Sequence, residues 1–143
     1  MLVKHILHEK GRDVVTVPSG ATLSEAAQLL ARRRIGAVVV RDGDRQIAGI
    51  LSERDIIRGL ADESVNALAQ TVATHMTERV STCRETDAVE DLMELMTRKR
   101  IRHVPVMDGE RLCGIVSIGD VVKSRIAETE AEAENLRGYI AAG

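Results

Sequence analysis

The pattern Gly-Ile-x-Ser-x-x-Asp occurs twice in this chain, and its residue types suit the binding of a nucleotide. The first copy places Ser52 before Asp55, and the second places Ser117 before Asp120. In each copy a strand-like run ends and a helical pattern begins at the serine, and the free N–H groups of a first helical turn favour a phosphate. A carboxylate at the aspartate can accept hydrogen bonds from the vicinal hydroxyls of a ribose. The two features together predict a nucleotide site.

The same spacing also has a purely structural interpretation. In a capping box the serine accepts a hydrogen bond from the third helical N–H, and the acidic side chain at that position bonds back to the serine N–H. The two roles are compatible. Recurrence of the pattern in register within a duplicated unit favours ligand binding in addition to capping.

A duplicated unit surrounds the two motifs. Leu23 and Leu30, on an apolar face with helical spacing, return 66 residues later as Val89 and Met96. The valine-rich runs, the Asp-Gly turns and the motifs themselves also recur, with one extra loop residue in the first copy. The sequence therefore predicts two copies of one supersecondary unit.

Each copy is predicted to fold as a β-α-β-β-α unit. The first has strands at 14–17, 37–41 and 47–51 with a helix at 23–34, and the second has strands at 80–82, 103–107 and 111–116 with a helix at 88–100. A further helix follows Ser52 or Ser117. Capping boxes are expected at Thr22-x-x-Glu25 and Asp87-x-x-Glu90.

We expect an α/β fold of the α+β type with two pseudo-symmetric units. One unit is too small to bury both faces of its sheet, so the two sheets should pack against each other with the helices outside. The predicted division is a capping segment at 1–13, a first repeat at 14–61, a partly helical linker at 62–78, a second repeat at 79–126 and a C-terminal helix at 127–143.

The C-terminal helix carries a weak heptad seam, formed by Val122, Ile126, Thr129, Ala133, Leu136 and Ile140. Two interpretations stay open for this helix. It either folds back on its own repeat or contacts a second copy of the chain.

Composition and charge argue against several functions. The chain has no Trp, no Phe and one Tyr, which disfavours an aromatic platform for single-stranded nucleic acid, and its net charge of −2 disfavours nucleic-acid partners generally. No apolar run approaches the roughly 18 residues of a membrane span. Cys83 and Cys113 are expected to be reduced core thiols of a cytoplasmic protein, with a bridge between them left open. His5 and His8 lack a third ligand, so no metal site is predicted.

The duplicated set resembles a tandem pair of CBS domains, also called a Bateman module. The residues that carry the resemblance are Gly49 through Asp55, Gly114 through Asp120, and Arg100 through Val106. The likeness covers roughly residues 10–126 and extends to small stand-alone bacterial members. It implies two clefts between the repeats that bind AMP, ADP, ATP, NAD(H) or S-adenosylmethionine.

The resemblance also implies which residues line each cleft. One cleft would use Asp55 and Ser52 with Ile101, Arg102, His103 and Val104. The other would use Asp120, Ser117 and Gly119 with Ile35, Gly36, Ala37 and Val38, plus Arg54. The first strands of the repeats, at Thr16 and Thr82, would line the clefts.

The two clefts are expected to differ in charge. Arg102 and His103 supply positive charge and a titratable donor, whereas Gly36 and Ala37 at the matching positions supply neither. The Asp55 cleft should therefore hold the more highly charged phosphate group.

The function expected from the sequence is regulatory and non-catalytic. An adenine nucleotide would alter the packing of the repeats or of a homodimer, and an unidentified effector protein would respond to that change. The alternative is a dimerisation or interaction scaffold with degenerate clefts. An enzyme is not expected, since no P-loop or Rossmann motif is present.

Overall fold

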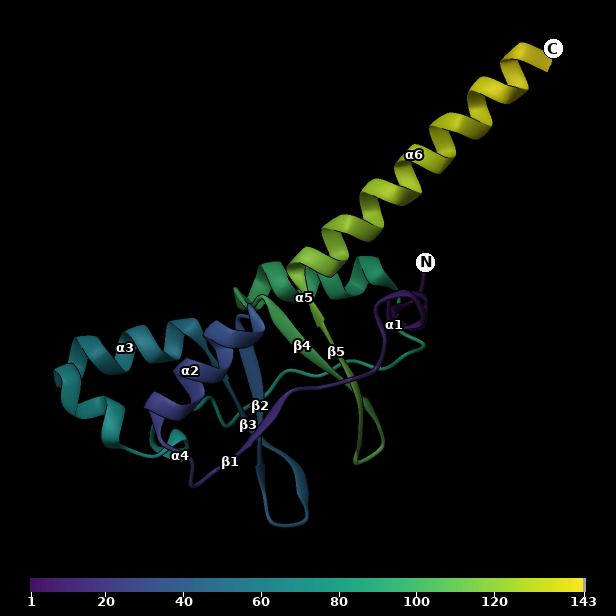
Figure 1. Ribbon diagram of the computed structural model, residues 1–143. Coiled ribbons are helices and arrows are strands. Elements are labelled where there is room, and N and C mark those ends of the chain that lie inside the picture. The colour runs from purple at the N-terminus through teal and green to yellow at the C-terminus, as the bar shows by residue number, and fades with distance from the viewer. Residues whose placement is uncertain (143) are drawn as a thin grey trace.

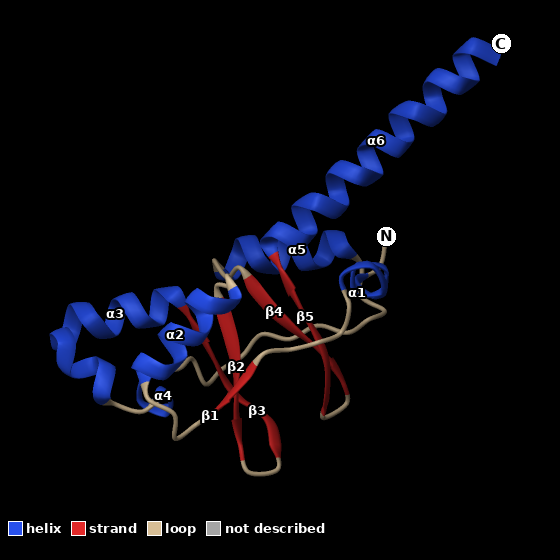
Figure 2. Ribbon diagram, viewed as in Figure 1, coloured by secondary structure: helices blue, strands red, loops and turns tan. Residues whose placement is uncertain are grey.

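The computed structural model describes residues 1–142 as two similar αβ units and a projecting helix (Figures 1 and 2). In chain order the elements are α1 (Val3–Lys10), β1 (Thr16–Pro18), α2 (Leu23–Arg33), β2 (Ala37–Asp42), β3 (Arg45–Ser52), α3 (Glu53–Glu63), η1 (Ser64–Ala69), α4 (Val72–His75), α5 (Val89–Lys99), β4 (His103–Asp108), β5 (Arg111–Ser117) and α6 (Ile118–Ala142). The two-unit α+β architecture predicted from the sequence is confirmed.

The first sheet has the order β1-β2-β3, with β1 parallel to β2 and β2 antiparallel to β3. The second sheet contains β4 and β5 alone. Figure 2 shows the two hairpins side by side, and the amide N–H of Leu112 on β5 donates to Gln46 Oε1 on β3 at 2.6 Å. The sheets therefore meet along these strands, as the duplicated pattern predicted.

The strand predicted at 80–82 is wrong, because only Cys83 pairs with β4, as an isolated bridge to Val106. Its N–H donates to the carbonyl oxygen of Pro105 at 3.0 Å, and its own carbonyl accepts from Met107 N at 2.8 Å. In the first repeat the N–H of Val39 donates to Val15 O at 3.2 Å, but Pro105 at the matching position has no N–H. The shorter ladder of the second repeat agrees with this missing donor.

The two repeats share their backbone geometry in detail. Arg34 and Arg100, which end α2 and α5, both have φ 54° and ψ 46°. At the next junction Glu53 N donates to Gly36 O at 3.0 Å, and Ile118 N donates to Arg102 O at 2.8 Å. The residue that precedes β2 or β4 is thus fixed to the start of that repeat's last helix.

The segments that precede the repeats complete their cores. Val72 N donates to Ala21 O in the first repeat at 2.7 Å, and Val3 N donates to Asp87 O in the second at 2.9 Å. The buried residues of α1, namely Val3, Ile6 and Leu7, belong to the core cluster of the second repeat. The start of the chain therefore packs on the second repeat, and α4 packs on the first.

The helix starts confirm most of the predicted caps. Thr22 Oγ1 accepts from Glu25 N at 3.1 Å, which is one of the two hydrogen bonds of the box expected for the first helix. The box predicted at Asp87-x-x-Glu90 is wrong, because Asp87 instead accepts a hydrogen bond from Arg84 N at 2.8 Å and Ala88 is the N-cap. Asp87 thus stabilises the turn that precedes α5, as aspartate often does.

Helix α6 is one continuous element that projects away from the body of the molecule (Figure 1). Its first turns are held by Arg125, which pairs with Glu90 on α5. Beyond them Leu136 and Ile140 are 60% and 69% exposed, so the helix does not fold back on its own repeat. The boundary predicted between 126 and 127 lies inside this helix. No helix among residues 1–142 is both long and apolar enough to cross a membrane.

Candidate functional site

A cavity of about 430 Å³ lies where the two repeats meet. We call it the Asp55 cavity. It is lined by Gly36, Ile50, Ser52, Glu53, Arg54, Asp55, Ile57, Arg58, Thr77, Arg79, Val80, Ser81, Lys99, Arg100, Ile101, Arg102 and His103. The lining combines β3 and α3 of the first repeat, the 77–81 segment, and the α5–β4 junction of the second repeat.

Asp55 is buried at the start of α3 with only 5% of its surface exposed. Its Oδ2 accepts hydrogen bonds from Ser52 N at 2.9 Å and Ser52 Oγ at 3.1 Å, and Asp55 N in turn donates to Ser52 Oγ at 3.4 Å. Oδ1 accepts from Thr77 Oγ1 at 3.2 Å and pairs with Arg58 at 3.5 Å. The capping box predicted here is confirmed, and the carboxylate that forms it also lines the cavity.

Positive charge dominates the lining. It contains six side chains that are cationic at neutral pH and only two carboxylates, Glu53 and Asp55, although the chain as a whole has a net charge of −2. The cationic residues are Arg54, Arg58, Arg79, Lys99, Arg100 and Arg102. Clustering of one charge sign in a concave site focuses the potential there, so this cavity favours an anionic ligand.

His103 lies between the repeats and is half buried. A Cβ added to Gly36 would be 3.0 Å from its Cε1, so the imidazole packs closely against the backbone at this glycine. Burial lowers the pKa of His103 below its ordinary value, Glu53 acts in the opposite direction, and Lys10 acts in the same direction as burial. The imidazole is thus neutral at pH 7 and can donate one hydrogen bond.

Asp120, at the start of α6, occupies the matching position in the second repeat. Its Oδ2 accepts from Ser117 N at 2.8 Å and from Lys10 Nζ at 2.6 Å, and Asp120 N donates to Ser117 Oγ at 3.1 Å. Burial raises the pKa of this carboxyl, but the hydrogen bonds from Lys10 and Ser117 outweigh burial and lower it below its ordinary value. The residues Lys10, Ser117 and Asp120 are called the Asp120 site below.

The structure brings together most residues assigned to the first cleft. Ser52, Asp55, Ile101, Arg102 and His103 all line the Asp55 cavity. Val104 does not, because its side chain is fully buried in the core of the second repeat.

The structure places several residues elsewhere than the resemblance implies. Arg54, assigned to the Asp120 cleft, lines the Asp55 cavity and donates to Arg100 O at 2.9 Å, and Gly36 lines the same cavity. Val80 and Ser81 line it in place of Thr82, since the chain reaches β4 only at Cys83. The other assigned residues, Thr16, Ile35, Ala37, Val38, Ser117, Gly119 and Asp120, lie outside this lining.

Sequence reasoning missed several cationic or polar residues. Arg58, Thr77, Arg79, Lys99 and Arg100 line the Asp55 cavity, and Lys10 bonds Asp120. Arg58 follows Asp55 by three residues on α3, a spacing that puts both on one helix face. Within residues 1–142 no group of three or more His, Cys, Asp or Glu side chains has the arrangement of a metal site.

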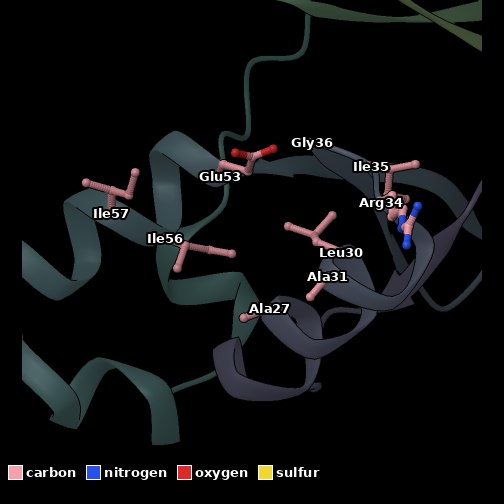
Figure 3. Close-up of a pocket in the computed structure, with 9 residues that line it drawn as sticks. All are labelled: Ala27, Leu30, Ala31, Arg34, Ile35, Gly36, Glu53, Ile56 and Ile57. Carbon is pink, nitrogen blue, oxygen red and sulfur yellow. The ribbon is translucent and has the colours of Figure 1, made fainter.

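A second cavity, of about 530 Å³, lies between α2 and α3 on the outer side of the first repeat (Figure 3). Figure 3 shows apolar side chains of both helices, among them Leu30 and Ile56, around this space, with Arg34 and Glu53 at its edge. Ile57 also lines it and is 66% exposed. The cavity is apolar and open, which suits a hydrophobic partner surface rather than a charged ligand.

Comparison with known proteins agrees with this architecture. The chain is 36% identical over 126 residues to the mitochondrial CBS domain-containing protein CBSX3 of Arabidopsis thaliana, covering 85% of this chain and 61% of that protein. The chain thus spans less than two thirds of this curated relative. The solved structure of the CBS-domain containing protein ATU1752 from Agrobacterium tumefaciens is 48% identical, with a TM-score of 0.85 over 87% of this chain and 92% of that one.

Two further solved structures contain adenosine compounds. The CBS domain protein PAE2072 from Pyrobaculum aerophilum, complexed with AMP, is 31% identical with a TM-score of 0.74 over 84% of this chain and 89% of that one. The CBS domain pair of protein MJ0100, in complex with 5′-methylthioadenosine and S-adenosyl-L-methionine, is 29% identical with a TM-score of 0.79 over 90% of this chain and 98% of that one. The family model of the CBS domain matches residues 3–62 and 70–127. The chain therefore belongs to the CBS-domain family, as a tandem pair.

Proposed function

We propose that this protein is a non-catalytic regulatory module that binds a phosphorylated adenine nucleotide in the Asp55 cavity. One observation supports this most strongly. The buried Asp55 carboxylate, which suits a ribose, shares a cavity of about 430 Å³ with six cationic side chains, which suit phosphate. The AMP complex of PAE2072 and the adenosine compounds bound by MJ0100 support an adenosine-type ligand.

The charge of the cavity selects among adenosine compounds. AMP carries nearly two negative charges at pH 7, since the second pKa of a phosphate monoester is about 6. S-adenosylmethionine carries a sulfonium cation, and 5′-methylthioadenosine is neutral. Six cationic side chains against two carboxylates therefore favour AMP, ADP, ATP or NAD(H) over these two compounds.

A ligand in this cavity would bridge the two repeats. Its ribose would contact Asp55 in the first repeat, and its phosphate would contact Arg102 and His103 in the second. Binding would then favour one relative packing of the repeats, by the difference in affinity between the two packings. An effector protein that binds one packing better would respond to nucleotide concentration in the cytoplasm.

We also propose a homodimer formed through the outer helical faces. The apolar cavity between α2 and α3 and the exposed side chain of Ile57 lie on one face of the first repeat. In the second repeat Val122 occupies the position that matches Ile57, and it is also exposed. Burial of these faces against a second copy would remove exposed apolar surface from water.

The first experiment is calorimetry of AMP, ADP, ATP, NADH, S-adenosylmethionine and 5′-methylthioadenosine with the purified protein and with Asp55→Asn. The phosphorylated compounds should bind, and Asp55→Asn should weaken them at least about tenfold. Asp62→Asn, on the same helix but outside the cavity lining, is the matched control and should bind normally. Binding of S-adenosylmethionine in preference to AMP would contradict the proposed ligand class.

A scaffold without ligand is the second candidate, and one observation favours it. Both Asp55 oxygens already have partners within the chain, namely Ser52, Thr77 and Arg58. If no compound in the panel binds at millimolar concentration to a folded protein, these contacts are purely structural and the scaffold is the better description.

A further inference from the structure

Helix α6 presents a stripe of mostly apolar residues to solvent. The helix begins at the Asp120 site and projects beyond α5 (Figure 1). Along it, residues of this stripe recur at intervals of four and three, a spacing typical of a helix that packs lengthwise against another helix. All of them are exposed except Ala133, which is half-buried. We call this set the apolar seam, and it consists of Val122, Ile126, Thr129, Ala133, Leu136 and Ile140.

The residue types of the apolar seam are those of a parallel two-stranded coiled coil. When the positions of its heptads are labelled a to g, Ile126 and Ile140 occupy a positions and Leu136 occupies a d position. Isoleucine at a with leucine at d favours two parallel strands. Gly138 falls at an f position, on the side of the helix away from the seam, so it does not interrupt the contact.

The charges beside the seam change sign from one heptad to the next. In a parallel pair, the g residue of one heptad faces the e residue of the following heptad on the partner. Arg125 would then face Glu130 of the second copy. Glu132 would face Arg137 of the second copy. Both pairs are attractive. In chain order the residues at positions e and g are Lys123, Arg125, Glu130, Glu132, Arg137 and Tyr139.

An antiparallel pair that buries the same seam would bring equal charges together. In that arrangement e residues face e residues and g residues face g residues. Glu130 would face Glu130 of the second copy, and Glu132 would likewise face its own counterpart. Lys123 would face Arg137. Since like charges in contact are destabilising, the charge pattern selects the parallel arrangement.

The charged side chains of the outer part of α6 are available for these contacts. No ion pair among residues 1–142 includes Glu130 or Glu132. Arg137 is 78% exposed and approaches Glu134 only at 3.8 Å. Arg125 already pairs with acidic side chains of its own chain. The contact between Glu132 and Arg137 is therefore the pair that can form at the least cost.

We propose that α6 forms a parallel, in-register coiled coil with α6 of a second copy of this chain. This inference rests on the homodimer of the proposed function and specifies how its two chains are oriented. Val122, the first residue of the seam, also belongs to the outer face proposed for that homodimer, so one interface continues from the repeats onto the helix. The parallel arrangement places both pairs of repeats at the same end of the coiled coil.

Disulfide trapping of the full chain measures the orientation. Ile126→Cys and Leu136→Cys are treated with oxidised glutathione, each alone and after mixing. In a parallel pair each seam residue faces its own counterpart, so each variant should link to itself. In an antiparallel pair residue 126 faces residue 136, so only the mixture should link. Asn135→Cys, exposed and outside the seam, is the matched control and should stay unlinked. Mass spectrometry of the linked peptides excludes links through Cys83 or Cys113.

Reversal of one charge tests the basis of the orientation. Arg137→Glu places two carboxylates opposite each other and should raise the dimer dissociation constant about tenfold, measured by sedimentation equilibrium. Addition of Glu132→Arg in the same chain should restore it, because the pair is attractive again. Glutamine at Glu130 or Glu132 should change it less, since each carboxylate also repels another glutamate four residues away on its own helix.

Links that form only in the mixture would show an antiparallel contact and overturn the proposal. A dimer in which neither variant links, or in which Glu132→Arg fails to rescue Arg137→Glu, would overturn this inference alone and leave the homodimer in place. A wild-type chain that stays monomeric at all concentrations would overturn the proposed homodimer with it.

Discussion

Gly49 packs closely against the backbone of Thr77, because a Cβ added at Gly49 would be 2.8 Å from the carbonyl oxygen of Thr77. The two segments also exchange hydrogen bonds, from Ile50 N to Thr77 O at 3.0 Å and from Thr77 N to Ile50 O at 2.9 Å. Thr77 Oγ1 then donates to Asp55. Gly49, the first residue of the Gly-Ile-x-Ser-x-x-Asp motif, thus permits the close packing that brings the Thr77 hydroxyl to Asp55, the last residue of the motif.

We predict that Gly49→Ala destabilises the protein and weakens nucleotide binding. The new methyl group would press on backbone and on Met76 Sδ, 2.6 Å away, so the 76–77 segment has to move away from β3. Overpacking of this kind costs about 1–3 kcal/mol of unfolding free energy. Urea denaturation measures the loss, and calorimetry with AMP measures the effect of displacing Thr77.

Two other glycines provide controls for this prediction. Gly114→Ala would meet Leu7 Cδ2 at 2.7 Å, which is the end of a flexible side chain, so its loss of stability should be smaller. Gly20→Ala meets nothing within 4 Å and should leave stability unchanged. If Gly49→Ala were as stable as Gly20→Ala, the close approach to Thr77 would not constrain the fold.

Stability should fall as the solution is acidified below about pH 6.5, the ordinary pKa of histidine. Burial lowers the pKa of His103 in the folded protein, so the unfolded chain binds a proton that the folded chain does not. The stabilisation from neutral His103 is therefore complete above the unfolded pKa and is lost as the pH falls through the lower, folded one. Urea denaturation at a series of pH values from 8 to 5 measures this slope.

His103→Gln is the matched variant, because glutamine keeps hydrogen-bonding groups at this position but does not titrate in this range. The variant should lose part of the pH dependence between pH 6.5 and 5. His8→Gln, on the exposed surface of α1, should keep it. An identical pH profile for the wild type and His103→Gln would show that the acid sensitivity arises elsewhere.

The sequence was sufficient to predict the repeat, because its signals are local. The helical spacing of Leu23 and Leu30, the Asp-Gly turns and the Ser-x-x-Asp caps all act over a few residues, and the structure places helices, hairpins and caps at these positions. Ser52 and Asp55 were predicted from this motif, whereas Ile101, Arg102 and His103 were assigned to the cavity by the resemblance to CBS pairs.

The remaining site residues depend on contacts between distant parts of the chain. Lys10 meets Asp120 across 110 residues of sequence, and Thr77 reaches Asp55 only because the 76–77 segment crosses Gly49. Val3 and Val72 are 69 residues apart, whereas the repeats are offset by 66. An alignment of these two valines would have indicated that the segments before the two repeats correspond to each other. The strand predicted at 80–82 failed for a local reason, since the missing N–H of Pro105 limits pairing along β4.

Arg102→Ala and Arg54→Ala should both weaken AMP at the Asp55 cavity, because both residues line it. Loss of one charge-assisted hydrogen bond to phosphate corresponds to about a tenfold fall in affinity. Calorimetry with AMP and adenosine distinguishes a phosphate contact from a general disturbance, since adenosine affinity should hold. Arg41→Ala, exposed on β2 outside the cavity lining, is the control. Full AMP affinity in Arg102→Ala would place the phosphate elsewhere.

Removal of residues 128–143 should weaken the proposed homodimer and leave the proposed nucleotide binding at the Asp55 cavity intact. The outer part of α6 carries exposed apolar residues at Leu136 and Ile140. Apart from the backbone bonds of the helix itself, the only side-chain hydrogen bond or ion pair between the described residues 128–142 and residues 1–127 joins Glu128 and Arg125. A free helix of this length is only marginally stable in water, so contact with a second copy would stabilise it.

Sedimentation equilibrium over a concentration series measures this effect, and the dimer dissociation constant should rise at least about tenfold in the shortened chain. The double variant Leu136→Gln, Ile140→Gln should reproduce the change in the full chain, because it removes the apolar seam and keeps the helix. Glu130→Gln, Glu132→Gln is the matched control, since both carboxylates are exposed and lie outside the seam. If shortening leaves the dissociation constant unchanged, the dimer contact is confined to the face formed by α2 and α3, where the apolar cavity and the exposed side chain of Ile57 already provide a surface for a second copy.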